Sequence, residues 1–297
     1  MTGFTFLINA NSGKHAGDAV AGAVADRLRD VGHQTRILRT TAAAQVPPLV
    51  ADAAERGDAV VSVGGDGTLA SIAEPVAKAG CALAILPAGR GNDFARTLGL
   101  PADAERLAAI LARGQTRPID MLRLDAGAPR LVAGSVYCGV DAAAAELVDH
   151  LRWMPGPAQY PCAALRTFAS FRPAQFRIDV DGAVRELSAA SVVVANSQYY
   201  GSGMKIAPSA DLSDGLAEVV TIEVRSRRAL MTSLPKVYDG RHVELPQVHV
   251  TRGRRIAINA SARTKMGGDG ELLGEVPPLD ATAALVEVLP AAVRVIC

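Results

Sequence analysis

The stretch AVVSVGGDGTLASIAEPVAKAG (59–80) decides the fold, because it leads from a buried strand into a helix through three glycines. The apolar run 59–64 predicts the strand, and the spacing of apolar residues over 69–80 predicts the helix, which Pro75 can kink. The connecting residues GGDGT (64–68) permit positive φ and leave backbone N–H groups uncovered. Such a loop forms either a tight turn or a phosphate-binding site at the start of the helix.

The same alternation of strand and helix continues on both sides of this stretch, up to residue 117. Apolar runs predict strands over 4–9, 35–39, 59–64 and 82–87, and apolar residues at helical spacing predict helices over 19–32, 46–57, 69–80, 92–98 and 102–113. Alternation of this kind is typical of a parallel sheet that helices cover on both faces.

Residues after 117 show a different pattern, in which strand-like runs follow one another and are separated by Gly, Asp and Pro. Helical spacing is found only over 142–151, 160–171 and 226–237. We therefore expect a second, mostly antiparallel β-domain. Because the join near residues 115–125 is short, the two domains are expected to abut, with a cleft between them.

The composition is that of an ordinary soluble protein and excludes several classes. Apolar residues make up 49% of the 297 residues, enough for a large core, and the net charge of +1 gives no support for a nucleic-acid partner. The scattered cysteines Cys81, Cys138, Cys162 and Cys297 form no CxxC pair, so we expect a reducing, cytoplasmic location without disulfides or a zinc site. The sequence shows no signal peptide and no run of roughly 18 apolar residues, so we expect any membrane contact to be peripheral.

Three glycine-containing loops follow predicted strands: NANSGKHAG (9–17), GGDGT (64–68) and LPAGRGNDFAR (86–96). The carboxyl ends of parallel strands meet at one edge of a sheet, where open α/β sheets bind ligands. In each loop, small residues let backbone N–H groups approach an anion at a helix N-terminus. The alternative in each case is an ordinary capped turn.

Side chains in the second and third loops supply further groups. Asp66 offers an acceptor for a ribose hydroxyl or for the second shell of a metal, and Thr68 is the expected N-cap if the loop is only a turn. In the third loop, Arg90 supplies a cation, and Asn92 or Asp93 is expected to cap the next helix.

GGDGT followed by LPAGRGNDFAR resembles the diacylglycerol kinase catalytic domain, which bacterial lipid kinases share with sphingosine and ceramide kinases. The similarity continues in order through INANSG (8–13), CGVDA (138–142), NSQYYGSGMKIAPSADLSDGLAEV (196–219) and GDGE (268–271). NAD kinases share a GGDG loop, but the Asn-Glu pair that they carry well downstream of it is not found here.

The resemblance implies an α/β + β fold in which the two domains bind different substrates. An N-terminal Rossmann-like α/β domain over 1–122 would bind the nucleotide, and a C-terminal antiparallel β-sandwich domain over 123–297 would receive the lipid substrate. The site would lie in the interdomain cleft, and the C-terminal tail would pack back on the first domain. ATP and Mg²⁺ are the implied cofactors.

The resemblance also implies which residues contact the nucleotide, in the three loops and at the end of the second strand. They are Asn9, Ser12, Gly13, Lys14, Thr40, Gly64, Gly65, Asp66, Gly67, Thr68, Gly89, Arg90, Gly91 and Asn92. The chain departs from the usual pattern at three places: Ala10 replaces a Pro, Arg90 replaces a Thr, and Ala70-Ser71 replaces an Asn-Glu pair. These departures keep open a nucleotide-binding regulator that has lost catalysis.

The turn GGDGELLGE (267–275) supplies the candidate for a catalytic base. A lipid hydroxyl that attacks a γ-phosphorus needs its proton accepted, and a carboxylate within hydrogen-bond reach does this. The resemblance implies Glu271 as the base and Asp269 as its support. A plain β-hairpin turn is the alternative.

A second acidic loop, APSADLSDGLAEV (207–219), is a candidate metal site, because oxygen ligands in a flexible loop suit Mg²⁺ or Ca²⁺. The resemblance implies a structural Mg²⁺ held by Asp211, Asp214 and the backbone of Leu216. An Asx-turn between strands is the alternative.

A basic, aromatic segment is the candidate for contact with lipid. Residues 151–178 contain no acid and alternate arginines with aromatic residues, and a second basic run is RSRRALM (225–231). The alternating residues are Arg152, Trp153, Tyr160, Arg166, Phe168, Phe171, Arg172, Phe176 and Arg177. Such a surface suits peripheral contact with anionic lipid at the inner membrane face, and a partly buried helix with a solvated basic face is the alternative.

The sequence therefore predicts an ATP-dependent lipid kinase that converts diacylglycerol to phosphatidate. The alternatives are a kinase of a sphingoid base or another alcohol, including a soluble polyol or nucleotide, and the inactive regulator. The retained Asp269-Gly270-Glu271 argues against the regulator, because a protein that only binds a nucleotide needs no base. The oligomeric state stays open, with a homodimer as one alternative.

Overall fold

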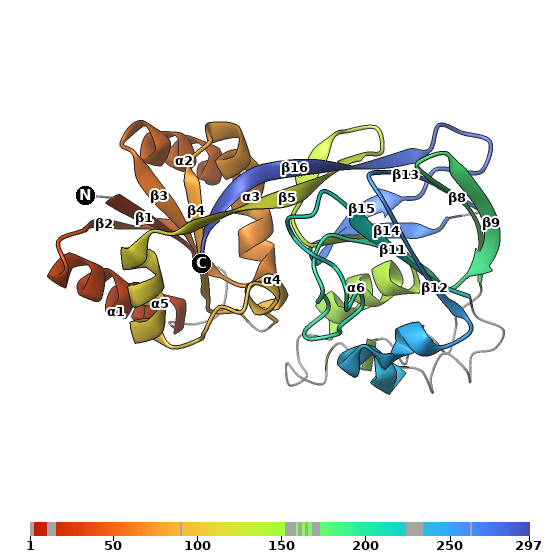
Figure 1. Cartoon of the computed structure of the whole chain (residues 1–297), viewed down its shortest axis with the longest axis horizontal. Coiled ribbons are helices and arrows are strands. Elements are labelled where there is room, and N and C mark those ends of the chain that lie inside the picture. The colour runs from red at the N-terminus through yellow and green to blue at the C-terminus, as the bar shows by residue number, and fades with distance from the viewer. Residues whose placement is uncertain are drawn as a thin grey trace. The chain divides into compact units, whose positions relative to one another are not determined.

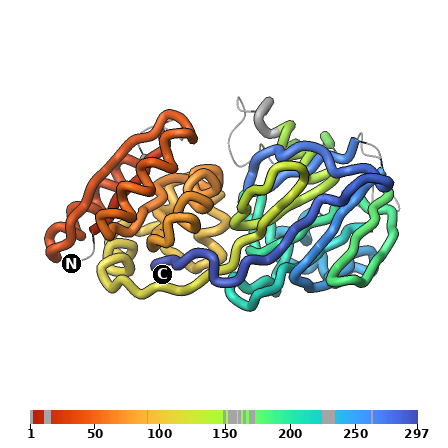
Figure 2. Tube along the Cα trace, turned by 90° about the horizontal axis from the view of Figure 1, so that it is seen from above, coloured from red at the N-terminus to blue at the C-terminus, as the bar shows by residue number. Residues whose placement is uncertain are grey.

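The computed structural model describes residues 3–10, 16–89, 91–151, 159, 162–163, 166–167, 173–223, 234–261 and 263–297. The chain forms two compact units (Figure 1). The first unit consists of Met1–Asp120 together with Pro290–Cys297, and the second consists of Met121–Leu289. Figure 2 shows the C-terminal residues, in blue, returning to the first unit, which residues 1–120 form.

The first unit is built on a parallel sheet with the strand order β2-β1-β3-β4. Its strands are β1 (Gly3–Asn9), β2 (Gln34–Thr40), β3 (Asp58–Gly64) and β4 (Ala82–Pro87), and the end of β16 (Ala284–Ile296) pairs in parallel with β4. Its helices are α1 (Ala16–Asp30), the short 3-10 helix η1 (Ala43–Gln45), α2 (Val46–Glu55), α3 (Asp66–Ala79), α4 (Asp93–Thr97) and α5 (Ala104–Arg113).

Helices cover both faces of this sheet, which explains why its central strand is buried throughout. Every residue of β3 is buried. Ala59, Val61 and Val63 pack in one cluster with α1 and α5, while α2 and α3 contact each other and β3. The predicted strand–helix alternation is confirmed.

The helix after the GGDGT loop begins earlier than the sequence predicts. We expected it to start at Leu69, but α3 begins at Asp66, and Gly65 is its N-cap without a side-chain cap hydrogen bond. Thr68 therefore lies inside the first turn, and its expected role as the N-cap is wrong. The residues predicted as a loop are in part the start of the helix.

The second unit contains two antiparallel sheets. One has the strand order β12-β11-β10-β7-β14-β15, and the other contains β16, β13, β8 and β9 with β5 and β6 beside them. The first sheet consists of β7 (Ser135–Gly139), β10 (Ser191–Ala195), β11 (Ala217–Ile222), β12 (Val248–Gly253), β14 (Lys265–Gly268) and β15 (Glu271–Glu275). The remaining elements are β5 (Thr116–Asp125), β6 (Arg130–Val132), α6 (Val140–His150), β8 (Ala174–Val180), β9 (Ala183–Ala189), β13 (Arg255–Ala260) and the 3-10 helix η2 (Arg241–Glu244).

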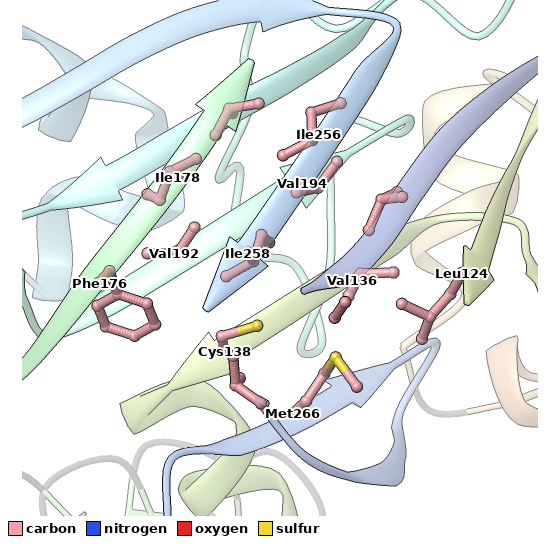
Figure 3. Packing of buried hydrophobic residues seen from close by; sticks show 14 of the residues in the cluster. Leu124, Val136, Cys138, Phe176, Ile178, Val192, Val194, Ile256, Ile258 and Met266 are labelled. Carbon is pink, nitrogen blue, oxygen red and sulfur yellow. The ribbon is translucent and has the colours of Figure 1, made fainter. Parts of the chain in front are cut away.

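Side chains from both sheets form one core (Figure 3). Val136, Cys138, Val192, Val194 and Met266 come from the first sheet, and Leu124, Phe176, Ile178, Ile256 and Ile258 come from the second. Two sheets that share a core in this way form a sandwich. The expected fold class, an α/β unit followed by an antiparallel β-sandwich, is confirmed.

Neighbouring residues on β7 face opposite sides of its sheet, as strand geometry requires. Val136 and Cys138 point into the sandwich core, whereas Tyr137 packs in a second cluster with Val193, Tyr200 and other residues. The sheet is therefore buried on both faces around β7.

Two predicted helices, 160–171 and 226–237, and most of the basic aromatic segment lie largely outside the described residues. Among the helices that the structure describes, none is both long and apolar enough to cross a membrane.

Candidate active site

The second and third glycine loops lie against each other at the carboxyl ends of β3 and β4. The two strands pair in parallel with Gly64 opposite Pro87, and the N–H of Ala88 donates to the carbonyl oxygen of Gly64 at 2.9 Å. A Cβ atom added to Gly89 would lie 2.2 Å from Cα of Gly65. The two glycines thus touch backbone to backbone, which is a contact that no side chain at position 89 permits.

Asp66 joins these two loops through its carboxylate. Oδ2 accepts a hydrogen bond from the N–H of Asp93 and Oδ1 accepts one from the N–H of Phe94, both at 3.1 Å. These are backbone donors of the first turn of α4, which otherwise have no partner within the helix. Asp66 is therefore the cap of α4, in addition to any role toward a ligand.

The expectation that Asn92 or Asp93 caps α4 is wrong. Asn92 occupies the N-cap position with φ 53° but makes no side-chain cap hydrogen bond. Instead its Oδ1 accepts from the N–H of Gly89, and its Nδ2 donates to the carbonyl oxygen of Gly89, both at 2.9 Å. The side chain of Asn92 closes the third loop. The N-terminal N–H groups of α4 are therefore capped by the carboxylate of Asp66.

The first turn of α3 leaves room for a ligand. Thr68 is buried beneath Gly64, where a Cβ would lie 2.4 Å from the Oγ1 of Thr68. A Cβ on Gly67 would meet nothing within 4 Å. Backbone N–H groups at the uncapped start of α3 and the closed third loop together form an arrangement that can bind a phosphate.

The ends of β1 and β2 bring together two further predicted residues. Asn9 is paired with Thr40 in the parallel register, and the N–H of Ala10 donates to the carbonyl oxygen of Thr40 at 2.8 Å. Thr40 is buried and its hydroxyl lies 3.4 Å from the carbonyl oxygen of Ile8. Gly17, at the start of α1, would meet Val63 at 3.6 Å if it carried a Cβ, so α1 begins directly over the sheet.

The other residues that were predicted to contact the nucleotide fall into two groups. Gly91 is described and stands in the third loop between Gly89 and Asn92. Ser12, Gly13, Lys14 and Arg90 lie outside the described residues.

In the second unit, Asp269 is held by backbone N–H groups. Its Oδ2 accepts from Ala133 at 2.7 Å, and its Oδ1 accepts from Gly134 at 2.8 Å and from Ser135 at 3.2 Å. Both oxygens of this carboxylate are thus tied to the start of β7. Asp269 anchors the turn that precedes Glu271.

Glu271 is the first residue of β15 and is exposed to solvent. The two acids of the Asp-Gly-Glu turn therefore differ in surroundings: one carboxylate is fixed in the structure and the other is open to a substrate. The roles of Asp269 as support and of Glu271 as base stay predictions.

The predicted metal ligands lie in two Asx-type turns. Asp211 Oδ1 accepts from the N–H of Ser213 at 3.0 Å, and Asp214 Oδ1 accepts from the N–H of Leu216 at 3.0 Å. The other oxygen of Asp214 forms an ion pair with Arg252. Arg252 lies directly opposite the buried Glu218 in the β11–β12 pair.

These residues do not present a ready metal site, because a guanidinium group already supplies positive charge to Asp214. Within the described part of the chain, no group of three or more His, Cys, Asp or Glu side chains could hold a metal ion. A cation bound at Asp214 Oδ2 would have to displace Arg252. The predicted Mg²⁺ at this loop therefore stays a prediction.

Sequence reasoning assigned no role to two residues that support the acidic turn. The side-chain Nδ2 of Asn196 donates to the carbonyl oxygen of Ala133 at 2.8 Å, which braces the segment that binds Asp269. The hydroxyl oxygen of Tyr137 accepts from the N–H of Gly270 at 3.2 Å. The signal for Asn196 was its place in the similar stretch 196–219, whereas Tyr137 lies one residue before the similar stretch 138–142.

Comparison with known proteins agrees with this geometry. Residues 3–124 match the family model of the diacylglycerol kinase catalytic domain, and residues 134–297 match that of the YegS C-terminal NAD kinase beta sandwich-like domain. A diacylglycerol kinase of Mycobacterium tuberculosis is 32% identical over 299 residues, which cover 98% of this chain and 94% of that protein.

Solved structures show the same fold at lower identity. A diacylglycerol kinase from Bacillus anthracis has a TM-score of 0.74 at 18% identity and covers 99% of this chain and 96% of that chain. An NAD kinase from Archaeoglobus fulgidus, solved in complex with ATP, has a TM-score of 0.56 at 13% identity, with coverage of 100% and 94%.

The family models and the relatives, together with the two-unit fold, identify a phosphotransferase of the lipid-kinase class. The chain belongs to the diacylglycerol kinase family. The predicted resemblance is confirmed.

Proposed function

We propose that the protein transfers the γ-phosphoryl group of ATP to the hydroxyl of diacylglycerol, giving phosphatidate and ADP. One observation carries the proposal: the exposed Glu271 follows a carboxylate that three backbone N–H groups hold in place. A protein that only binds a nucleotide gains nothing from an acid presented in this way. The name of the M. tuberculosis relative supports the choice of acceptor.

The loops of the first unit are proposed to bind the phosphates of the nucleotide. Backbone N–H groups at the start of α3 would donate to phosphate oxygens, with Gly89 and Gly65 packed too closely for any side chain to intervene. Asp66 would keep α4 and the third loop in register with the second loop. Asn9, Thr40, Lys14 and Arg90 are proposed as further contacts of this site.

Glu271 is proposed to accept the proton of the lipid hydroxyl as its oxygen attacks the γ-phosphorus. The new bond joins the lipid oxygen to phosphorus, the bond to the bridging β,γ-oxygen breaks, and ADP leaves with that oxygen. The carboxylate of Glu271 gains the proton, and Asp269 keeps its turn in place. Mg²⁺ bound with ATP would neutralise charge on the phosphates, as it does in kinases generally.

A peripheral lipid surface is proposed to deliver the substrate, through the basic aromatic segment 151–178 without Phe176. The expectation that Phe176 contacts lipid is wrong, because its ring is buried in the core of the sandwich. Binding to vesicles of anionic lipid should weaken as salt increases, since the attraction is electrostatic. Sedimentation with anionic and with neutral vesicles tests this. Equal binding to both at all salt concentrations, or binding to neither, would contradict the surface.

The test of the proposed reaction is phosphate transfer from labelled ATP to a panel of acceptors in mixed micelles: diacylglycerol, sphingosine, ceramide and NAD. Transfer to diacylglycerol is expected. Transfer to sphingosine or ceramide in its place would reassign the acceptor, transfer to NAD alone would overturn the lipid assignment, and transfer to none would favour a regulator.

A further inference from the structure

We infer that Tyr137 is a positioning residue for the catalytic base: its buried hydroxyl oxygen holds the backbone of Gly270 and so sets where the carboxylate of Glu271 lies. The inference rests on the proposed function. It names a residue whose side chain acts only through the turn that carries the base.

The ring of Tyr137 is fitted to this turn. Tyr137 lies on β7 and is 2% exposed, and the residue that pairs with it on β14 is Gly267. A Cβ on Gly267 would lie 2.4 Å from Cε2 and 2.9 Å from Cζ of the ring, so the ring fills the space that a side chain would take. From there Oη reaches the N–H of Gly270 at 3.2 Å.

The same segment of chain holds the turn at two successive residues. Asp269 is bound through its carboxylate to Ala133, Gly134 and Ser135, and Gly270 is bound through its N–H to Tyr137. The N–H of Asp269 also donates to the carbonyl oxygen of Ser135 at 3.3 Å, and Gly268 pairs with Glu271 between β14 and β15. The bond from Gly270 to Tyr137 adds a contact on the residue directly before Glu271 and so orients the end of the turn that carries the base. Glu271 follows immediately, so its carboxylate starts from a fixed backbone.

The hydroxyl of Tyr137 is suited to be a permanent acceptor. Burial raises the pKa of Tyr137 above its usual range, and the negative charge of Asp269 adds to the effect. The group therefore remains a neutral hydroxyl at any pH at which a kinase works. The centroid of its ring lies 5.6 Å from that of the Tyr200 ring, a contact that Phe at position 200 would keep.

Tyr137→Phe removes the acceptor and keeps the ring. The N–H of Gly270 then has no hydroxyl oxygen to donate to, and the backbone directly before Glu271 becomes more mobile. Because misplacement of a reacting group by about 1 Å can cost on the order of 100-fold, we expect kcat to fall about 10- to 100-fold. The KM for ATP should stay within about twofold, since the glycine loops are untouched.

A double-mutant cycle separates positioning from general damage. If Tyr137 acts through Glu271, then Tyr137→Phe should change the residual turnover of Glu271→Gln by less than about twofold. A merely structural defect would lower turnover by the same factor in both backgrounds.

Tyr200→Phe is the matched control. It removes another buried tyrosine hydroxyl from the same cluster, but that hydroxyl bonds Asp141 and not the turn. The Tyr200→Phe variant should be less stable than the wild type but have the same kcat. Hydrogen exchange of the Gly270 amide gives a readout independent of activity, and it should accelerate in Tyr137→Phe and not in Tyr200→Phe.

The expected result is a fall in kcat for Tyr137→Phe that disappears in the Glu271→Gln background, together with faster exchange at Gly270. Wild-type kcat in Tyr137→Phe, an equal loss in both backgrounds, or unchanged exchange would each overturn the inference while the kinase reaction stands. If the wild-type protein phosphorylates no acceptor, the proposed function fails first and the positioning role fails with it.

Discussion

The carboxylate of Asp66 caps the helix that begins at Asp93, although the two residues lie 27 positions apart in the sequence. The bond crosses from the second glycine loop to the third. An acid in the GGDGT loop thus orders the start of the helix in the third loop.

Asp66→Ala should destabilise the first unit and weaken ATP binding. Losing a charged acceptor for two backbone N–H groups costs about 1–3 kcal/mol of unfolding free energy, and the third loop loses its tie to the second. Asp103→Ala is the control, because Asp103 caps α5 by accepting from Arg106 at 2.9 Å and touches neither loop. Chemical unfolding and calorimetric titration with ATP measure both quantities. Equal ATP affinity in the two variants would contradict the organising role.

Gly89→Ala should reduce ATP affinity by forcing the two loops apart. Its Cβ would lie 2.2 Å from Cα of Gly65, a backbone atom that cannot rotate away. Overpacking of this kind costs about 1–3 kcal/mol. Gly22→Ala in α1 is the control, since a Cβ there meets nothing within 4 Å and Ala favours the helix. ATP affinity at the wild-type level in Gly89→Ala would show that the contact between the loops is dispensable.

Arg252→Gln should make the acidic loop more sensitive to divalent cations. The guanidinium of Arg252 pairs with Asp214, so a cation must compete with it in the wild-type chain. Without nucleotide, Mg²⁺ or Ca²⁺ should raise the melting temperature of Arg252→Gln more than that of the wild type. Asp214→Asn added to Arg252→Gln should remove the extra shift. A shift that is the same in all three proteins would mean that the cation binds elsewhere.

Alkaline pH should destabilise the second unit in part through Cys138. Burial raises the pKa of this thiol from 9.0 to about 12, with the charge of Asp141 adding to the effect. Between these two values the unfolded chain has lost the proton and the folded chain keeps it, so stability falls as pH rises. The slope contributed by one such group is about 1.4 kcal/mol per pH unit.

Cys138→Ala removes this titration, so its unfolding free energy should fall less steeply than that of the wild type above pH 9. Urea unfolding followed by circular dichroism at several pH values measures the difference. Parallel curves for the two proteins would show that Cys138 does not titrate as its burial requires.

Much of the fold follows from local sequence. Strand and helix periodicity predicts the α/β unit and the antiparallel unit, because each pattern is read within one element. The start of α3 at Asp66 was missed because glycines inside GGDGT suggest a loop, whereas here they occupy the N-cap and the first turn. Gly65 and Gly89 touch because β3 and β4 are neighbours, whereas the sequence predicted only that their loops share one edge of the sheet.

The supporting contacts of the site could not be predicted. Asp66 reaches Asp93, and Tyr137 reaches Gly270 across 133 positions, through register and side-chain direction that no local pattern encodes. Asn92 was expected at a helix cap because of its residue type, but its left-handed backbone turns the side chain toward Gly89. Arg252 was missed because its partner, Asp214, lies on a different segment.

The central claim is that Glu271 is the base of a lipid kinase, and Glu271→Gln tests it most directly. Turnover of diacylglycerol should fall by about 10²–10⁴-fold, or about 3–5 kcal/mol of barrier, because the amide cannot accept the proton. ATP affinity should be nearly unchanged. Glu275→Gln, at the other end of the exposed strand β15, should keep wild-type turnover. Wild-type turnover in Glu271→Gln would contradict the account.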